Sequence, residues 1–192
     1  EGVPLEKVAM ETEISGLSIV PATIDLSSAD IDLISNEKRS HLLHEALRKK
    51  QENKQKYDYI LIDCPPSLNI LTVNAMVASH SVLIPLQSEF FALEGLSQLL
   101  LTVKEVRQNA NENLRVEGIV LTMFDGRNNL SKQVEADARS NLRELVFKTI
   151  IPRNVRVSEA PSYSMPVLTY DPSSKGSKAY MSLAKELLAN NS

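Results

Sequence analysis

Cysteine, glycine and long apolar runs are all scarce in this sequence, and each shortage excludes a class of protein. A single cysteine, Cys64, among 192 residues excludes an intramolecular disulfide framework and a four-thiolate metal site, and it is typical of a reducing, cytosolic compartment. No apolar run approaches the ~18 residues of a membrane helix, and the first residues do not form a signal peptide. Only six glycines are present, and none begins a G-x-x-x-x-G-K-[ST] phosphate-binding loop.

The formal charge of −3, from 21 Lys and Arg against 24 Asp and Glu, gives no overall signal for nucleic-acid binding. The charges are nevertheless segregated along the chain. Residues 1–37 carry eight acids and one base, whereas residues 38–56 carry seven bases and two acids, and residues 125–156 carry seven bases and four acids. A weakly acidic protein can therefore present a local basic face.

Short apolar runs alternate with amphipathic, helical patterns. We expect strands at 17–21, 57–63, 81–86, 116–124 and 147–151. We expect helices at 25–53, interrupted near Asn36, and at 92–110, 130–145 and 174–188, with a long loop over 152–166. This order predicts an α/β protein with a doubly wound, mostly parallel sheet and helices on both faces. We interpret residues 1–192 as a single domain whose ligands bind beyond the carboxyl ends of the strands.

One strand end carries a candidate catalytic group. Four apolar residues lead into Asp63 in Tyr59-Ile60-Leu61-Ile62-Asp63. This is the Walker B pattern, in which a carboxylate holds Mg²⁺, usually through water. By itself the pattern is found more often in ordinary buried strands, and Asp63 needs a phosphate-binding loop that the sequence does not contain.

Other kinds of site have weaker support. His41 and His44 lie on one helix face but lack an evident third metal ligand. Cys64 has no paired histidine and is interpreted as a small buried residue. Two loops that follow strands, 125–129 and 153–156, combine Arg with Asn. This composition suits phosphate contacts, and composition alone favours a solvated surface equally.

Taken together, several phrases resemble the ParA/Soj family of partition ATPases, in the deviant Walker (MinD/ParA) branch of the P-loop NTPases. The matching stretches run over almost the whole chain: 58–68, 91–96, 121–130, 151–162 and 170–176. The fold that this resemblance implies is P-loop NTPase-like, with the N-terminal strand and helix missing, so that the chain forms about the C-terminal three-quarters of the domain.

The resemblance implies a nucleotide site for ATP and Mg²⁺. Asp63 would be the Walker B acid near Mg²⁺, holding the ion through water. Three residues would form switch II, which senses the γ-phosphate: Pro65, Pro66 and Ser67. Three others would lie near the adenine and ribose: Pro152, Arg153 and Asn154.

The resemblance also implies partners. Arg127 and Arg156 match arginines that bind double-stranded DNA without reading its sequence, and Lys175, with Lys178, would extend that surface. ATP would join two subunits into a homodimer, and a ParB-type centromere-binding protein would stimulate hydrolysis. The protein would act in the cytoplasm on the nucleoid, without a membrane.

The family's phosphate-binding loop, its signature lysine and an aspartate that positions the attacking water are all absent from the sequence. We therefore expect the intact protein to be an ATPase and this chain alone to be inactive. Two alternatives remain open. One is a DNA- or partner-binding module that naturally lacks the phosphate-binding loop. The other is a MinD-like division-site ATPase, although residues 183–192 carry only one base and do not form a basic membrane helix.

Overall fold

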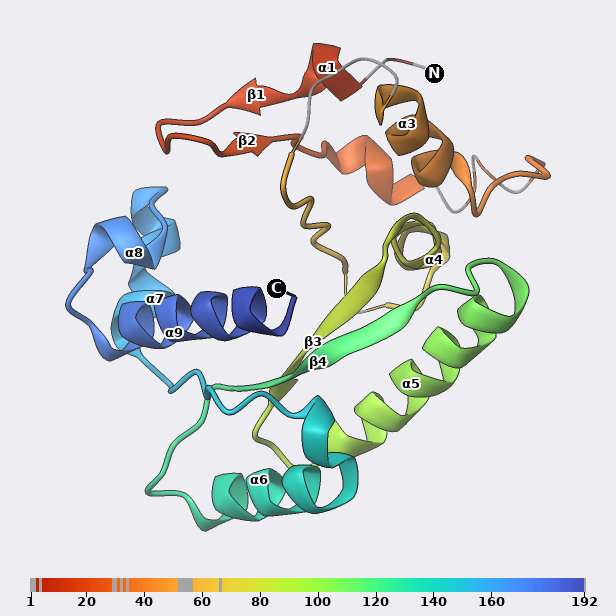
Figure 1. Ribbon diagram of the computed structural model, residues 1–192. Coiled ribbons are helices and arrows are strands. Elements are labelled where there is room, and N and C mark those ends of the chain that lie inside the picture. Colours follow the sequence, from red (N-terminus) through yellow and green to blue (C-terminus); the bar gives the residue numbers. More distant parts are fainter. Residues whose placement is uncertain are drawn as a thin grey trace. The chain divides into compact units, whose positions relative to one another are not determined.

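The computed structural model describes residues 3, 5–28, 31, 33, 35–51, 57–65 and 67–191. The chain divides into two compact units, shown together in Figure 1. The first comprises residues 1–81 and 102–115, and the second comprises residues 82–101 and 116–192. Each unit is described by itself. Pro66, which belongs to the predicted switch II, lies outside the described residues.

The predicted parallel sheet is confirmed around strands β3 (Ser81–Gln87) and β4 (Arg115–Thr122), which are hydrogen-bonded neighbours. The amide of Arg115 donates to the carbonyl of His80 at 3.1 Å, and that of Ser88 donates to Thr122 at 3.2 Å. From the first of these hydrogen bonds to the second, the residue numbers rise along both strands, so the strands are parallel. Helix α5 (Ala92–Asn109) makes the crossover that a parallel pair requires.

A third run, 146–152, extends the pairing beside β4. Parallel bridges join Val146 to Ile119 and Pro152 to Phe124. Between them, the amide of Phe147 donates to Ile119 at 2.9 Å, and that of Ile151 donates to Leu121 at 2.8 Å. The run expected at 147–151 is thus hydrogen-bonded to β4 through bridges rather than as a continuous strand.

Alternate side chains of β4 face two different apolar clusters. Ile119 and Leu121 are fully buried with residues of α5 and of α6 (Asn129–Leu142). Val120 points the other way and packs with Phe147 and with α9 (Lys175–Asn190). Burial of one such side chain contributes about 1.5–3 kcal/mol. Helices therefore cover both faces of the sheet, as predicted, and Figure 1 shows α9 opposite α5 and α6.

The first unit contains an antiparallel hairpin where the sequence predicts a strand of the main sheet. Strand β1 (Met10–Glu11) pairs antiparallel with β2 (Ser18–Ile19). The amide of Thr12 donates to Leu17 at 3.1 Å, and Gly16 adopts φ 80°, which a hairpin turn readily takes. The placement of 17–21 in a parallel sheet is therefore wrong, because a local turn supplies its partner. Short helices flank the hairpin: α1 (Leu5–Val8) and the 3₁₀ helix η1 (Ile24–Ser28).

Helix α4 (Ile70–Ala78) packs with α3 (Leu42–Gln51). The expected helix at 25–53 is confirmed in its second half by α3, whereas α4 was not predicted. The buried amide of Asn74 on α4 donates to Arg39 at 2.6 Å and accepts from the amide of Leu43 at 3.3 Å. Asn111 donates to the carbonyl oxygens of Met76, Val77 and Ser79, which satisfies the end of α4.

The predicted strand at 57–63 is wrong, because these residues form an irregular segment. Side chains that should be buried in a sheet are open to solvent, with Leu61 85% exposed and Ile60 54% exposed. An extended segment becomes a strand only when its backbone N–H and C=O groups form hydrogen bonds with a neighbouring extended segment. Among the described residues, this segment belongs to no strand pair.

The long loop expected over 152–166 contains two short helices, α7 (Val155–Glu159) and η3 (Ala160–Tyr163). The 3₁₀ helix η2 (Arg143–Leu145) forms the end of the helix expected at 130–145, and α8 (Val167–Tyr170) follows the loop. Asn154 caps α7 by accepting from the amide of Val157 at 3.3 Å, and Pro161 stands in the first turn of η3. Asn-capped turns this short leave little periodic signal in a sequence. Within the described part of the chain, no helix has the length and apolarity needed to cross a membrane.

Candidate functional site

The carboxyl ends of β3, β4 and the run 146–152 meet at one edge of the sheet. The Ser88 hydroxyl donates to the carbonyl of Thr122 at 3.3 Å, and the amide of Arg153 donates to that of Phe124 at 3.0 Å. Met123, between Thr122 and Phe124, adopts φ 53°. This left-handed conformation is uncommon outside glycine, and it turns the chain at the end of β4. This edge is where open parallel sheets bind ligands.

Arg127 binds one carboxylate at this edge, that of Asp125. Arg127 donates from Nε to Oδ1 at 3.0 Å and from Nη2 to Oδ2 at 2.8 Å, and its backbone amide also donates to Oδ1 at 3.0 Å. These hydrogen bonds, with the charges of Arg127 and Arg153, lower the pKa of Asp125 to about 2. Asp125 therefore stays ionised throughout the neutral range. The Arg127 side chain is 92% exposed.

Arg156 lies between two carboxylates. It donates from Nη1 to Oε2 of Glu159 at 2.9 Å, one helical turn along α7, and its Nε lies 3.4 Å from Oδ2 of Asp171. Glu159 raises the pKa of the guanidinium. The hydroxyl of Tyr170 donates to the same Glu159 oxygen at 3.4 Å. The Arg156 side chain is 52% exposed.

Asp171 connects Arg156 to the start of α9. Its other oxygen, Oδ1, accepts from the Ser173 hydroxyl at 2.8 Å and from the amides of Ser173 and Ser174 at 3.1 Å each. These hydrogen bonds lower the pKa of Asp171 against the effect of partial burial. Ser174 then caps α9, whose first residue is Lys175.

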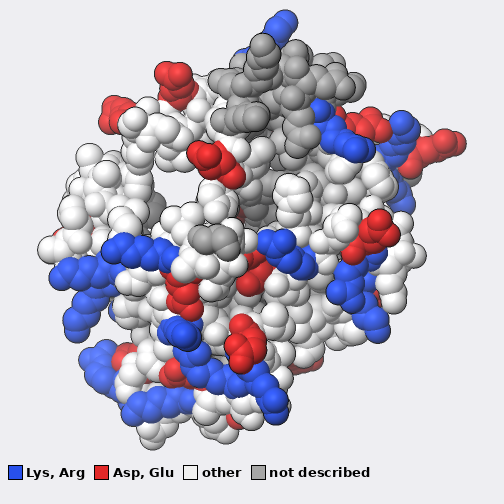
Figure 2. Space-filling model, viewed as in Figure 1, with Lys and Arg blue, Asp and Glu red and all other residues white. Residues whose placement is uncertain are grey.

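The structure thus brings together Arg153 with Arg127, and Arg156 with the end of α9 that bears Lys175. No hydrogen bond or ion pair among the described residues links the Arg127 group to the Arg156 group. On the face shown in Figure 2, Lys and Arg side chains gather over α6 and the loop that enters it, and others lie over α9, with Asp and Glu between them. The basic surface is therefore local and interspersed with acids.

The predicted Walker B segment belongs to the first unit. Asp63 and Pro65 are exposed, and the carbonyl of Ser67 accepts from the Thr72 hydroxyl at 2.7 Å, just before α4. Partial desolvation and the neighbouring Asp63 carboxylate raise the pKa of the Cys64 thiol. Cys64 therefore stays protonated at neutral pH, which agrees with its interpretation as a non-nucleophilic residue, but it is exposed rather than buried.

In the described ranges, no three His, Cys, Asp or Glu side chains converge to form a metal site. Asp63 is a single exposed carboxylate. A carboxylate such as that of Asp63 is a type of ligand that Mg²⁺ takes in proteins, beside its waters and the phosphates of a nucleotide.

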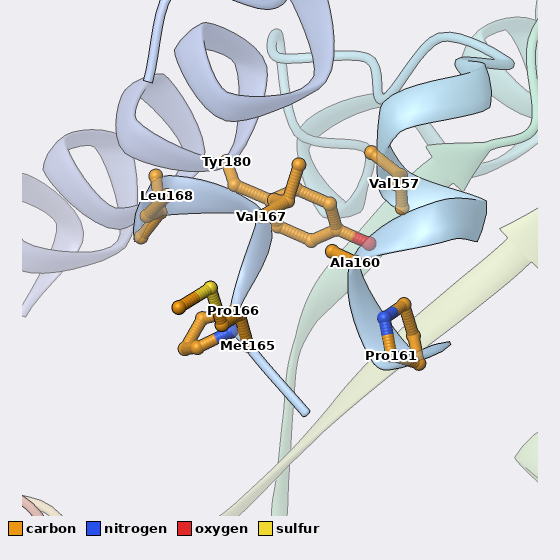
Figure 3. A pocket seen from close by; sticks show the side chains of 8 residues that line it. All are labelled: Val157, Ala160, Pro161, Met165, Pro166, Val167, Leu168 and Tyr180. Carbon is orange, nitrogen blue, oxygen red and sulfur yellow. The ribbon is translucent and has the colours of Figure 1, made fainter. Parts of the chain in front are cut away.

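An apolar pocket of about 320 Å³ lies among α7, η3, α8 and α9. Figure 3 shows the ring of Tyr180 from α9 reaching toward Val157 and Ala160, with Met165 and Pro166 on another side. Its eight lining residues include no charged side chain. None of the predicted nucleotide and DNA residues lines this pocket, although Val157 directly follows Arg156 in α7.

Sequence reasoning missed the acids that pair with the arginines. Asp125 lies two residues before Arg127, and Glu159 lies three residues after Arg156, a spacing at which helical residues become neighbours. Both spacings are readable in the sequence. The pairing of Arg156 with Asp171 had no local signal, because the fold alone brings them together.

A parallel sheet with helices on both faces and polar loops at its carboxyl edge makes the chain a doubly wound α/β protein, and its solved structural neighbours show that the fold is P-loop NTPase-like. Cobyrinic acid a,c-diamide synthase from Mycobacterium smegmatis, solved with bound ADP and magnesium, has a TM-score of 0.77 and 34% identity, over 97% of this chain and 67% of that one. A putative plasmid partition protein from Borrelia burgdorferi bound to AMPPNP has a TM-score of 0.79 at 22% identity, over 97% and 70% of the two chains, which supports the fold alone.

Sequence comparisons define the family. A family model described as an AAA domain matches residues 1–116. Chromosome partitioning protein ParA of Caulobacter vibrioides is 51% identical over 97% of this chain and 69% of its own length. Sporulation initiation inhibitor protein Soj of Bacillus subtilis is 51% identical over 93% of this chain and 70% of its own length. The chain belongs to the ParA/Soj family of chromosome-partitioning ATPases.

Proposed function

We propose that this chain forms the larger part of an ATP-dependent chromosome-partitioning protein that acts in the cytoplasm on the nucleoid. The 51% identity to Chromosome partitioning protein ParA over 97% of the chain carries this proposal. In the proposed cycle, Mg²⁺ and ATP join two subunits, the dimer binds double-stranded DNA without sequence preference, and a ParB-type partner stimulates hydrolysis and releases the DNA.

The proposed nucleotide site has three groups of residues, each with its own role. Pro152, Arg153 and Asn154 would contact the adenine and ribose, which their place at the carboxyl edge of the sheet supports. Asp63 would hold Mg²⁺ through water. The remaining role, sensing of the γ-phosphate, falls to switch II: Pro65, Pro66 and Ser67. Bound Mg²⁺ would neutralise charge that develops on the phosphates during hydrolysis.

The proposed DNA site consists of Arg127, Arg156 and Lys175. Both guanidinium groups are accessible, at 92% and 52% exposed. Lys175 is exposed at the first turn of α9. Their contacts would be with phosphates, which confer affinity without reading bases and make that affinity fall steeply with salt.

The test compares Arg127→Ala and Arg156→Ala in the intact protein with ATP and Mg²⁺, using duplexes of unrelated sequence. We expect each variant to weaken binding of all duplexes alike and to reduce the slope of log affinity against log salt by about 1 for each phosphate that is no longer neutralised. Arg107→Ala is the matched control, since Arg107 is an exposed arginine in the last turn of α5. Unchanged affinity of both test variants at low salt would remove these arginines from the DNA site.

A second test concerns the 192-residue chain by itself. Because no glycine in it begins a G-x-x-x-x-G-K-[ST] loop, we expect no ATP hydrolysis above background. Mg²⁺-dependent phosphate release by the purified chain would contradict this expectation.

A further inference from the structure

The two arginines proposed for DNA binding already have carboxylate partners within the chain. Arg127 forms a two-point ion pair with Asp125, at 3.0 and 2.8 Å. Arg156 pairs with Glu159 at 2.9 Å and lies 3.4 Å from Asp171. By contrast, Lys175 has no ion pair within the part of the chain that the structure describes.

These pairs lie at the surface, where a second anion can reach the guanidinium. Arg127 is 92% exposed and Asp125 28% exposed, and the Arg156 and Glu159 side chains are 52% and 40% exposed. A two-point carboxylate pair uses the same planar donor edge that binds a phosphate. A DNA phosphate must therefore displace the carboxylate or bind beside its negative charge.

We infer that Asp125 and Glu159 are internal counter-ions that weaken DNA binding by Arg127 and Arg156, and so set the affinity of the protein for DNA. This inference rests on the proposed function. It gives the acids a role opposite to that of the arginines, since removal of their charge strengthens binding instead of weakening it.

Asp125→Asn and Glu159→Gln isolate the charge from the structural hydrogen bonds. In Asp125→Asn, the remaining side-chain oxygen would still accept from the backbone amide of Arg127, and in Glu159→Gln the remaining oxygen would still accept from the hydroxyl of Tyr170. Asp171 is less suitable for the test, because its carboxylate also binds the two serines at the start of α9.

We expect each amide variant of the intact protein, with ATP and Mg²⁺ at about 0.1 M salt, to bind random-sequence duplex DNA about two- to tenfold more tightly. Matched controls are Asp137→Asn on α6 and Glu144→Gln on η2, because both acids are exposed and form no ion pair among the described residues. An equal gain in the controls would assign the effect to net charge and would overturn the inference.

A double-mutant cycle completes the test. In an Arg127→Ala background, Asp125→Asn should no longer strengthen binding, and in an Arg156→Ala background, Glu159→Gln should no longer strengthen it. If the alanine variants weaken DNA binding but the amide variants do not strengthen it, the counter-ion inference alone fails. If the alanine variants leave DNA binding unchanged, the proposed DNA site itself fails.

Discussion

The carboxylate of Glu186 on α9 accepts the backbone amide of Thr149 at 2.9 Å, and its second oxygen accepts that of Lys148 at 2.7 Å. Both amides belong to the run 146–152, which pairs with β4 on its other side. Glu186 therefore joins α9 to the run 146–152 through two hydrogen bonds. Burial alone would raise the pKa of Glu186, but these hydrogen bonds and the charge of Lys148 outweigh it and lower that pKa.

We predict that Glu186→Gln lowers the free energy of unfolding by about 1–2 kcal/mol, because a glutamine has one acceptor oxygen and presents an amide group to the second backbone donor. Urea denaturation measures the change. Glu144→Gln, an exposed acid without an ion pair in the described chain, should change stability by much less. Equal stabilities of Glu186→Gln and the parent protein would show that the two hydrogen bonds contribute nothing net.

The lowered pKa of Glu186 predicts a pH dependence. A carboxyl group whose pKa is lower in the folded state stabilises the fold above its ordinary value of 4.5, and this contribution disappears as the pH falls through the lowered pKa. The stability difference between the parent protein and Glu186→Gln should therefore shrink below about pH 4.5. Asp125 and Asp171 titrate in both proteins and cancel in the difference. A constant difference down to acid unfolding would contradict the assignment.

Gly176 allows α9 to begin in contact with α7. A Cβ at this position would clash with Cγ2 of Val157 and lie 3.3 Å from Oδ1 of Asn154, the cap of α7. We predict that Gly176→Ala destabilises the protein by about 1–3 kcal/mol in thermal or urea unfolding. Val157→Ala in the same chain should restore part of the stability by making room.

The matched control for Gly176→Ala is Gly95→Ala. Gly95 is a helical glycine in α5 with nothing within 4 Å of its added Cβ. Its replacement should be neutral or should stabilise by up to about 1 kcal/mol, because alanine has the higher helix propensity. Similar effects of the two alanines would show that the contact with Val157 is not what matters at Gly176.

For the proposed Mg²⁺ role, we predict that Asp63→Asn in the intact protein lowers Mg²⁺-dependent ATP hydrolysis by about 10- to 100-fold, the range for loss of a group that orients a metal's ligands. Nucleotide binding in the presence of a chelator should change little. Asp58→Asn is the control, since Asp58 is an exposed acid of the same segment. Full activity of Asp63→Asn would exclude Asp63 from the magnesium site.

Local patterns predicted most of the second unit. The apolar runs at β3 and β4 and the amphipathic spacing of α5, α6 and α9 place these elements within a few residues of their observed bounds. Helix α4 was not predicted, because the apolar and small residues of Ile70–Ala78 show no polar face. The segment 57–63 has the composition of a strand, but composition cannot supply the neighbouring strand that completes it.

Of the candidate site, the sequence identified the arginines, the strand-end loops and the family phrases, because these depend on residue type and short spacing. By itself, the sequence determined that the chain is an α/β protein with polar, Arg-bearing loops after its apolar runs. The tertiary structure alone decided that Arg156 lies against Asp171, fifteen residues later, and that Arg153 acts on the carboxylate of Asp125. Such pairings depend on how distant segments of the chain pack. They also determine how much of the positive charge of each arginine is left to attract a DNA phosphate in the proposed site.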